Sequence, residues 1–343
     1  MKDNKKHKKA EYGILITGLI ILLAAACIIA LCAGQYSVSV PEVIKILASR
    51  FVNVTKTWSN TAEGVVFTLR LPRIIGAVLV GSALSLSGAA YQGVFKNPLV
   101  APDLLGVSSG ACVGASVAIL LHLNSFGVQA MAFVAGILAV GLTLFIPRLI
   151  KNTNMTMLVL SGIIVKGIMD SVMGIIKYVA DPETELQSIT YWQLGSLTKV
   201  LPKDLFTVGP VIVAASVIIF LLRWRINILS LGDREAKTLG VSVTIVRNFI
   251  IICATLLTAS AVCISGTIGW IGLVIPHFAR MLTGPDNTKA IPASILMGAI
   301  FMVVIDTLAR ALTSVELPLS ILTGIIGAPF YIIILARQRM KLS

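Results

Sequence analysis

One short stretch of this chain matches a pattern known from catalysis. Residues 106–110, GVSSG, fit the G-x-S-x-G pattern of serine hydrolases, in which the serine attacks from a sharp strand-to-helix turn and needs a histidine and an acid as partners. Here the stretch opens an apolar run instead. Three histidines occur in the chain, none with evident access to this stretch: His7, His122 and His277. We therefore interpret Gly106, Gly110 and Gly114 as a stripe of small residues that lets two helices pack closely.

Two charges within another apolar run are the second candidate for chemistry. Lys166 and Asp170 are four residues apart, so they share one face of a helix. Ionisable side chains inside a membrane are costly and often functional, for example in a proton relay. An i,i+4 ion pair can equally be a mutual neutralisation, and we interpret this pair as structural.

A metal site would need several ligands that converge. His277 follows Pro276, and no cluster of histidine, cysteine or aspartate surrounds it in the sequence. We expect it to bond a backbone group or to shape the inner end of its helix. The five cysteines lie in apolar segments without the spacing of metal ligands, and we interpret them as small core residues: Cys27, Cys32, Cys112, Cys253 and Cys263. The sequence therefore predicts neither a metal site nor a catalytic residue.

The composition places the chain in a membrane. Hydrophobic residues make up 57% of its 343 residues and charged residues only 13%, and the mean hydropathy is +0.94. Soluble domains carry about 25% charged residues. The excess of 28 lysines and arginines over 15 acids could indicate a nucleic-acid partner. However, these cations stand at the ends of apolar runs and form no basic face with interleaved aromatics, so we expect membrane lipid and no nucleic acid.

The chain contains ten apolar runs, and the helices that they form must position any functional residue. A helix of about 20 apolar residues spans a bilayer, because unpaired backbone groups are not tolerated in hydrocarbon. The first run follows a basic N-terminus and resembles a signal peptide, but its length favours a retained span. The ten predicted spans are 12–33, 64–91, 103–121, 126–149, 155–178, 205–222, 241–263, 270–283, 290–312 and 318–336.

The predicted spans contain a repeat. Residues 81–106 and 259–284 align without gaps and share matched S-G steps and the pair Pro98/Pro276. The third and eighth spans are short or interrupted by glycine and proline, at corresponding positions of the two copies. Most lysines and arginines face the cytoplasm when both termini are placed there. The copies then enter the membrane from opposite sides, an inverted repeat typical of transporters.

We therefore predict one all-α polytopic membrane domain over 1–343, with about ten transmembrane helices and an inverted repeat of spans 2–5 and 7–10. Residues 1–11 form a cytoplasmic tail in this prediction. Residues 34–63 form an outer loop with a short surface helix and the entry to span 2. Residues 230–241 form a short cytoplasmic helix in which Asp233 is the N-cap, Glu235 stands in the first turn and Gly240 closes the end. A simple membrane-surface connector is the alternative for this segment.

Seven motifs in order resemble a known family: LRLPR (69–73), SGAAYQGVFKNPLVAPDLLGVSSGA (87–111), WQLGSL (192–197), LGDREAKTLGV (231–241), SGTIGWIGLVIPHFAR (265–280), DTLAR (306–310) and ELPLSILTGIIGAPFYIIIL (316–335). Together they resemble the FecCD-type permease subunit of ABC importers for iron–siderophores, haem and cobalamin. The resemblance covers about residues 12 to 337.

The resemblance implies a set of partners. A second permease subunit, this chain or a paralogue, completes the pathway. Two cytoplasmic ATPase subunits bind ATP and Mg, and an extracytoplasmic binding protein delivers the chelate. The chain has no G-x-x-x-x-G-K-[ST] phosphate loop, so it is not itself the ATPase. Residues in the family's coupling-helix region are expected to contact the ATPase: Asp233, Arg234, Glu235, Lys237 and Leu239.

By the same resemblance, Arg70, Arg73 and Arg310 are expected to dock acidic residues of the binding protein, since a guanidinium offers a planar fork to carboxylates. The alternative is snorkelling to the interface and, for Arg310, an i,i+4 pair with Asp306. Pathway contacts are expected among residues of the second and fifth spans: Ser82, Ser85, Tyr91, Gln92, Met169 and Met173.

The sequence thus predicts a transport subunit, not an enzyme, in a bacterial cytoplasmic (inner) membrane with both termini in the cytoplasm. An iron–siderophore complex is the expected cargo, with haem or cobalamin as alternatives. A secondary transporter driven by an ion gradient and an intramembrane hydrolase are the rival classes.

Overall fold

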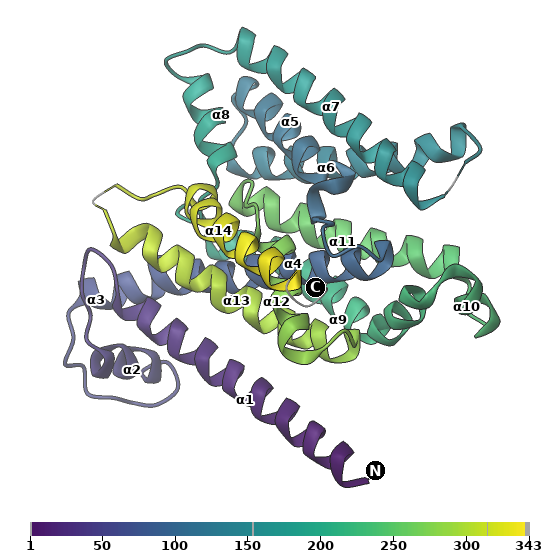
Figure 1. Ribbon diagram of the computed structural model, residues 1–343. Helices are drawn as coiled ribbons and strands as arrows, with labels where there is room; N and C mark the ends of the chain where they lie inside the picture. Colours follow the sequence, from purple (N-terminus) through teal and green to yellow (C-terminus); the bar gives the residue numbers. More distant parts are fainter. Residues whose placement is uncertain (1, 153, 314, 340–343) are drawn as a thin grey trace.

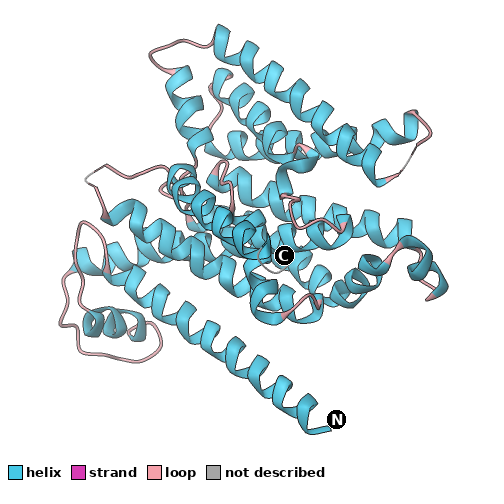
Figure 2. Ribbon diagram, viewed as in Figure 1, coloured by secondary structure: helices cyan, strands magenta, loops and turns pink. Residues whose placement is uncertain are grey.

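The computed structural model describes residues 2–152, 154–313 and 315–339, and these residues form helices joined by turns and loops, without a strand among them (Figure 2). The helices are α1 (Lys2–Cys32), α2 (Val40–Ala48), α3 (Asn60–Gly64), α4 (Leu71–Phe95), α5 (Val107–Leu120), α6 (Ser125–Leu149), α7 (Met155–Val179), α8 (Glu185–Leu194), α9 (Pro202–Leu231), α10 (Asp233–Thr238), α11 (Val243–Ser265), α12 (Ile271–Thr283), α13 (Asn287–Ala311) and α14 (Leu319–Arg339). A π-helical turn, Val65–Arg70, joins α3 to α4, and a 3-10 turn, Pro102–Leu105, precedes α5.

The ten predicted spans are confirmed. Seven described helices are long and apolar enough to cross a membrane, and three described apolar stretches are shorter: α5, α12 and Leu319–Ile332 of α14. The predicted shortness of the third and eighth spans is confirmed as well, because α5 has 14 residues and α12 has 13. At 1.5 Å per residue, a helix of about 14 residues reaches only ~21 Å, less than the ~30 Å hydrocarbon thickness. The turns before them must therefore lie at membrane depth, inside protein.

The helices alternate in direction, so the bundle has two ends (Figure 1). At one end, near α10, Lys96 and Arg247 both pair with Asp233. The Tyr12 hydroxyl donates to the Lys289 carbonyl at the same end. The opposite end carries α2, α3 and α8. We call these the α10 end and the α2 end.

The packing reproduces the predicted inverted repeat of α4–α7 and α11–α14. Helix α4 of the first unit packs against α12 and α13 of the second, and α11 of the second packs against α5 and α6 of the first. The first helix of each unit thus packs against two helices of the other unit, as expected when a pseudo-two-fold axis relates the two units.

The residue pairing proposed for the repeat is wrong in register. Pro98 lies in the turn after α4, whereas Pro276 lies inside α12. Gly88 lies within α4, whereas Gly266 ends α11. The break between helices is longer in the first unit than in the second, so a gap-free alignment matches turn with helix.

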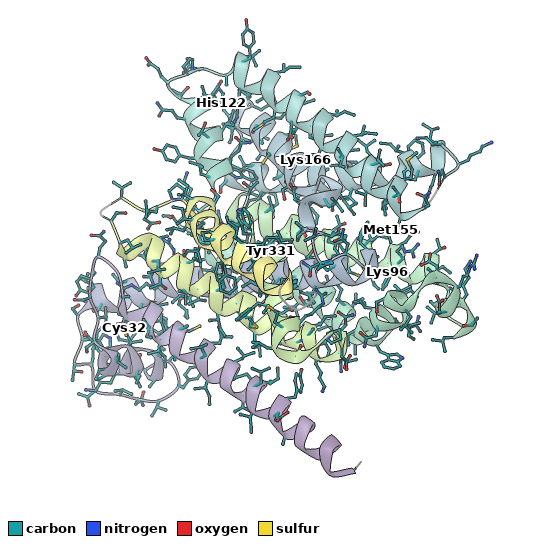
Figure 3. All side chains as sticks on the ribbon, viewed as in Figure 1. Cys32, Lys96, His122, Met155, Lys166 and Tyr331 are labelled. Carbon is teal, nitrogen blue, oxygen red and sulfur yellow. The ribbon has the colours of Figure 1, made fainter. Side chains whose placement is uncertain are left out.

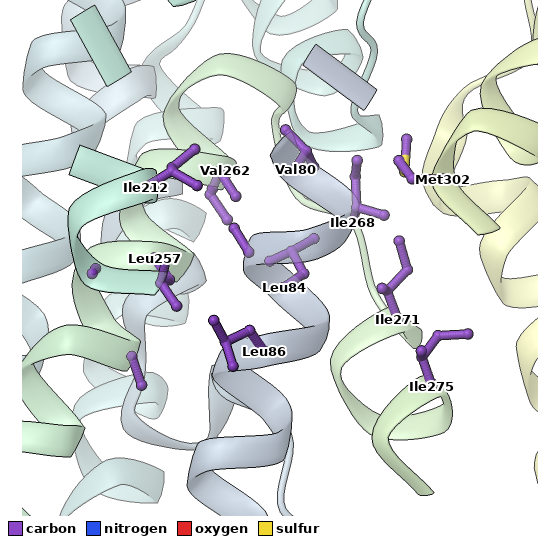
Figure 4. Packing of buried hydrophobic residues seen from close by; sticks show 14 of the residues in the cluster. Val80, Leu84, Leu86, Ile212, Leu257, Val262, Ile268, Ile271, Ile275 and Met302 are labelled. Atoms are coloured by element: carbon purple, nitrogen blue, oxygen red, sulfur yellow. The ribbon is translucent and has the colours of Figure 1, made fainter. Parts of the chain in front are cut away.

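Helix α4 is the centre of the subunit. Its buried Val80 and Leu84 pack among side chains of α9, α11 and α12 (Figure 4). Where α4 meets α12, a Cβ added at Gly88 would stand 1.8 Å from the Gly272 carbonyl oxygen. The hydrophobic effect does not drive helices together in lipid as it does in water. Small residues let the helix backbones approach closely there, and the resulting van der Waals contacts stabilise the packing.

Residues 2–11 of the predicted cytoplasmic tail are helical and continuous with the rest of α1. The short helix expected within 34–63 is α2, which buries Val43 and Ile46 and exposes Val40 and Ile44.

Candidate functional site

The first candidate region is α10, which stands away from the bundle with most of its side chains exposed. Gly232 precedes it at φ 144° and Gly240 follows it at φ 77°, a conformation that glycine adopts without steric cost. The predicted closure by Gly240 is therefore confirmed. Ala236 is buried against the bundle. The four expected ATPase contacts Arg234, Glu235, Lys237 and Leu239 are exposed together.

Asp233 does not cap α10 as predicted. It is the first residue of the helix, and Gly232 occupies the N-cap position without a side-chain hydrogen bond. The Asp233 carboxylate is instead held by Arg247 Nη2 at 2.7 Å and by Lys96 Nζ at 3.4 Å. The hydrogen bond from Arg247 lowers the pKa of Asp233 below its usual value, against the opposing effect of partial burial. These contacts tie α10 to the ends of α4 and α11.

The second candidate region holds the three arginines at the α2 end, and all of them are buried. Arg70 donates to the carbonyl oxygens of Leu31 at 2.6 Å and Cys32 at 3.2 Å, and also to that of Tyr36. Arg310 donates to the carbonyl of Ala33 at 2.8 Å and to that of Ala30. Because α1 ends at Cys32, these guanidiniums satisfy the last carbonyls of that helix.

Arg73 belongs to an ion cluster in which Asp306 is buried and Glu316 is exposed. Its Nε donates to both oxygens of Asp306 at 2.9 and 3.0 Å, and its Nη1 donates to Glu316 at 2.8 Å. Arg310 Nε lies 3.9 Å from Asp306, as its i,i+4 alternative expected. The arginine forks predicted to reach an outside partner are thus engaged inside the subunit.

The third candidate region is a cavity of about 390 Å³ between α5, α7 and the turn before α12. Its polar and sulfur-bearing lining comprises Asp103, Ser108, Ser109, Cys112, Lys166, Asp170, Met173, Gln193 and Thr267. The cavity thus brings together Met173, the two charges of α7 and the serines of the GVSSG stretch. Figure 3 shows Lys166 on α7, well away from Lys96 near α10.

The ion pair in this cavity differs from the predicted one. Lys166 Nζ bonds Asp103 Oδ2 at 3.1 Å, and Asp170, one turn along α7, forms no hydrogen bond within the described residues. The lysine reaches across the cavity because the 3-10 turn before α5 brings Asp103 to its opposite wall. Asp103 was missed from the sequence, although a carboxylate at the start of an apolar run was a signal for it.

Four expected pathway residues on α4 lie inside the subunit. Ser85 Oγ donates to the Ser294 carbonyl at 2.8 Å, Tyr91 bonds Thr255 at 2.9 Å, and Gln92 Nε2 donates to Leu273 at 3.1 Å. Ser82 Oγ donates to the Ile295 carbonyl at 3.2 Å. They join α4 to α11, α12 and α13. Of the two expected pathway residues on α7, Met169 is half-buried and Met173 lines the cavity.

Gly110 and Gly114 of the predicted glycine stripe pack α5 closely against α6, whereas Gly106 precedes α5 at φ 80°. A Cβ at Gly110 would stand 2.5 Å from Ala139 Cβ, and one at Gly114 would stand 2.2 Å from the Met131 carbonyl oxygen. His277 is buried, with its ring 6.4 Å from that of Tyr331 in an edge-on contact. In the described part of the chain, no group of three or more histidines, cysteines and acids could hold a metal ion.

Comparisons with known proteins agree with this architecture. The model of the FecCD transport family matches residues 22–337. The molybdate import system permease protein MolB of Haemophilus influenzae is 37% identical over 322 residues, which cover 94% of this chain and 95% of MolB. A Helicobacter pylori protein named as an iron chelatin transport system permease is 41% identical over 275 residues, covering 80% of this chain and 83% of its own. A solved structure described as an inward-facing conformation of a metal-chelate type ABC transporter superposes with a TM-score of 0.85 at 34% identity, covering 95% of this chain and 99% of that one.

Proposed function

Because this chain belongs to the FecCD transport family and is a membrane-spanning permease subunit of an ABC importer, we propose that its cargo is an iron–siderophore complex and that the cargo passes along α7. The single observation that carries the choice of α7 is its polar face. Lys166, Asp170 and Ser171 are exposed at the middle of this apolar helix.

A polar face of this kind is unfavourable against lipid. A charged side chain at the bilayer centre costs at least about 2.5–3.5 kcal/mol on insertion scales. Such residues therefore face a partner protein or a water-filled path. A second permease subunit packed near α7 would enclose this path, with the cavity in its wall.

In this arrangement the α10 end lies in the cytoplasm, in a bacterial inner membrane with both termini cytoplasmic. The basic residues near this end include Lys96, Lys237 and Lys289, in keeping with the positive-inside rule. Asp233, Arg234, Glu235, Lys237 and Leu239 then present α10 to the ATPase, which binds ATP and Mg. Leu239 is 59% exposed beside these charged residues. An exposed apolar side chain among charges is suited to binding in a groove of a partner protein.

The α2 end then faces the binding protein. We propose that Arg70, Arg73 and Arg310 support docking from beneath the surface, because their guanidiniums hold the end of α1 and the ends of α4 and α13 in place. Exposed residues above them, such as Thr198 and Lys199, make the contact itself.

The test is uptake by cells that lack this chain. Radio-iron is supplied on hydroxamate and catecholate siderophores, on citrate and in haem, and labelled cobalamin and molybdate are supplied in parallel. Selective loss of one siderophore, restored by the intact chain and not by Glu235→Arg, supports the proposal. Molybdate is the second candidate, favoured by the similarity to MolB over almost the whole chain, and loss of molybdate uptake alone would replace the first proposal.

A further inference from the structure

We propose that the cavity between α5 and α7 selects cargo by charge, favouring neutral or cationic chelates that donate hydrogen bonds and opposing polyanions. This inference rests on the proposed iron–siderophore function and names the chelate class within it. Its basis is the arrangement of Asp103, Lys166 and Asp170 around the cavity.

The charges of the cavity do not cancel. Lys166 neutralises one carboxylate by bonding Asp103 Oδ2. Asp103 Oδ1 is buried without a hydrogen-bond partner, and buried acceptors in native proteins are rarely left unsatisfied. Asp170 adds a second carboxylate that is exposed toward the same space. Among the residues that line the cavity, two carboxylates against one amine leave an excess negative charge and unused acceptor positions.

The rest of the lining suits a ligand that makes hydrogen bonds. Ser108, Ser109 and Thr267 contribute hydroxyl groups, and Gln193 contributes an amide. A volume of about 390 Å³ accommodates one arm or face of a large chelate rather than the whole. An arm bearing amide N–H, hydroxyl or ammonium groups would supply donors to Asp103 Oδ1 and to Asp170.

The membrane setting makes this charge effective. Coulomb energies rise as the dielectric constant falls, and a wall of packed helices screens charge far less than bulk water does. Ferric hydroxamates are neutral, because monoanionic hydroxamate groups balance Fe³⁺, and a pendant ammonium makes them cationic. Catecholate groups are dianionic and leave the ferric complex a polyanion. The cavity therefore favours the hydroxamate class over the catecholate class, over citrate complexes and over molybdate.

The experiment compares uptake of a cationic ferric hydroxamate, a neutral one and a ferric catecholate in cells whose only chelate importer contains this chain. Asp170→Lys reverses the free charge of the cavity. Asp103→Asn removes one of the two carboxylates, so that Asp170 balances Lys166 and the excess negative charge is lost. Each variant should lower the ratio of cationic hydroxamate to catecholate uptake by about tenfold, as expected for a charge change within several ångströms of the cargo.

The matched control is Glu183→Lys, the same charge reversal at an exposed residue beyond the end of α7 and outside the cavity. It should leave the ratio unchanged. Because a ratio is measured within one strain, a lower amount of folded importer does not mimic the effect. Co-purification of the ATPase with each variant confirms assembly.

The outcomes separate this inference from the proposed function. An unchanged ratio in both Asp170→Lys and Asp103→Asn overturns charge selection and leaves iron transport intact. A wild-type preference for the ferric catecholate would also overturn charge selection and leave iron transport intact. Uptake of neutral cobalamin without any iron chelate would refute the iron proposal and agree with the charge rule, whereas uptake of molybdate alone would refute both.

Discussion

Arg73 and Asp306 form a bifurcated hydrogen bond across 233 residues of sequence, with Arg73 Nε 2.9 and 3.0 Å from the two carboxylate oxygens. The contact fastens α4 to α13 at the α2 end. The Asp306 side chain is 2% exposed and that of Arg73 is 10% exposed. Removing Arg73 leaves the buried Asp306 carboxylate with only Arg310, whose Nε lies 3.9 Å away, whereas removing Asp306 as well takes that poorly compensated charge away.

We therefore expect Arg73→Met to lower the stability of the purified protein by about 3–5 kcal/mol, because the buried Asp306 carboxylate loses its main partner. The double variant Arg73→Met with Asp306→Leu should lose clearly less. Thermal unfolding in detergent measures both, with Arg225→Met at an exposed site of α9 as the control. A double variant at least as unstable as the single one would refute the ion-pair explanation.

Gly88 should not tolerate a larger residue. The Cβ of Gly88→Ala would stand 1.8 Å from the Gly272 carbonyl oxygen, so α4 and α12 would have to separate. Overpacking of this kind costs about 1–3 kcal/mol. The matched control is Gly141→Ala in α6, where nothing lies within 4 Å of the added Cβ and helix propensity favours alanine by up to ~1 kcal/mol. Equal melting temperatures for the two variants would contradict the close packing.

Glu235→Arg should weaken association with the ATPase. The residue is exposed in the first turn of α10, where an acid is favourable near the helix N-terminus. We expect less ATPase to co-purify and uptake to fall. Arg225→Glu, a charge reversal on exposed α9 surface, is the control and should retain both. Intact co-purification and uptake in Glu235→Arg would remove α10 from the proposed interface.

The stabilising contact of Asp233 with Arg247 and Lys96, which holds α10, should be insensitive to pH in the physiological range. The hydrogen bond from Arg247 lowers the pKa of Asp233, so its contribution to stability is complete above the unfolded-state pKa of about 3.9. That contribution is lost only as pH falls through the lower folded-state pKa. The difference in melting temperature between wild type and Asp233→Asn should thus stay constant from about pH 5 to 8 and shrink below about pH 4. A difference that changes near neutral pH would show that another group holds α10.

Arg70→Lys should separate a supporting role from a direct docking role. A lysine cannot reproduce the fork that serves the carbonyls of Leu31, Cys32 and Tyr36, so the connection between α1 and α2 should loosen and become more sensitive to protease. Affinity for the binding protein should fall by a similar factor at low and high salt. A direct ion pair predicts a loss that is largest at low salt, because salt screens exposed charges. That result would restore the docking assignment of Arg70.

Several features followed from local properties of the sequence. The ten spans are set by the length of apolar runs, since a bilayer requires each crossing backbone to satisfy its own hydrogen bonds. The left-handed glycine after α10 and the close packing of Gly110 and Gly114 also depend on residue type and spacing within one or two helices. Such features are encoded over a few turns of chain, which is the range that a sequence pattern describes.

The tertiary structure alone decided the partners of the charges and the burial of the polar residues. Lys166 bonds Asp103 rather than the Asp170 that shares its helix, and Arg73 meets Asp306 rather than solvent. Tyr91 and Gln92 on α4 form hydrogen bonds with residues of α11 and α12. Each outcome depends on which helix faces come together after packing. The hydropathy of a helix predicts that it is buried in the membrane. It gives little information about which face of the helix contacts lipid, protein or the cargo pathway.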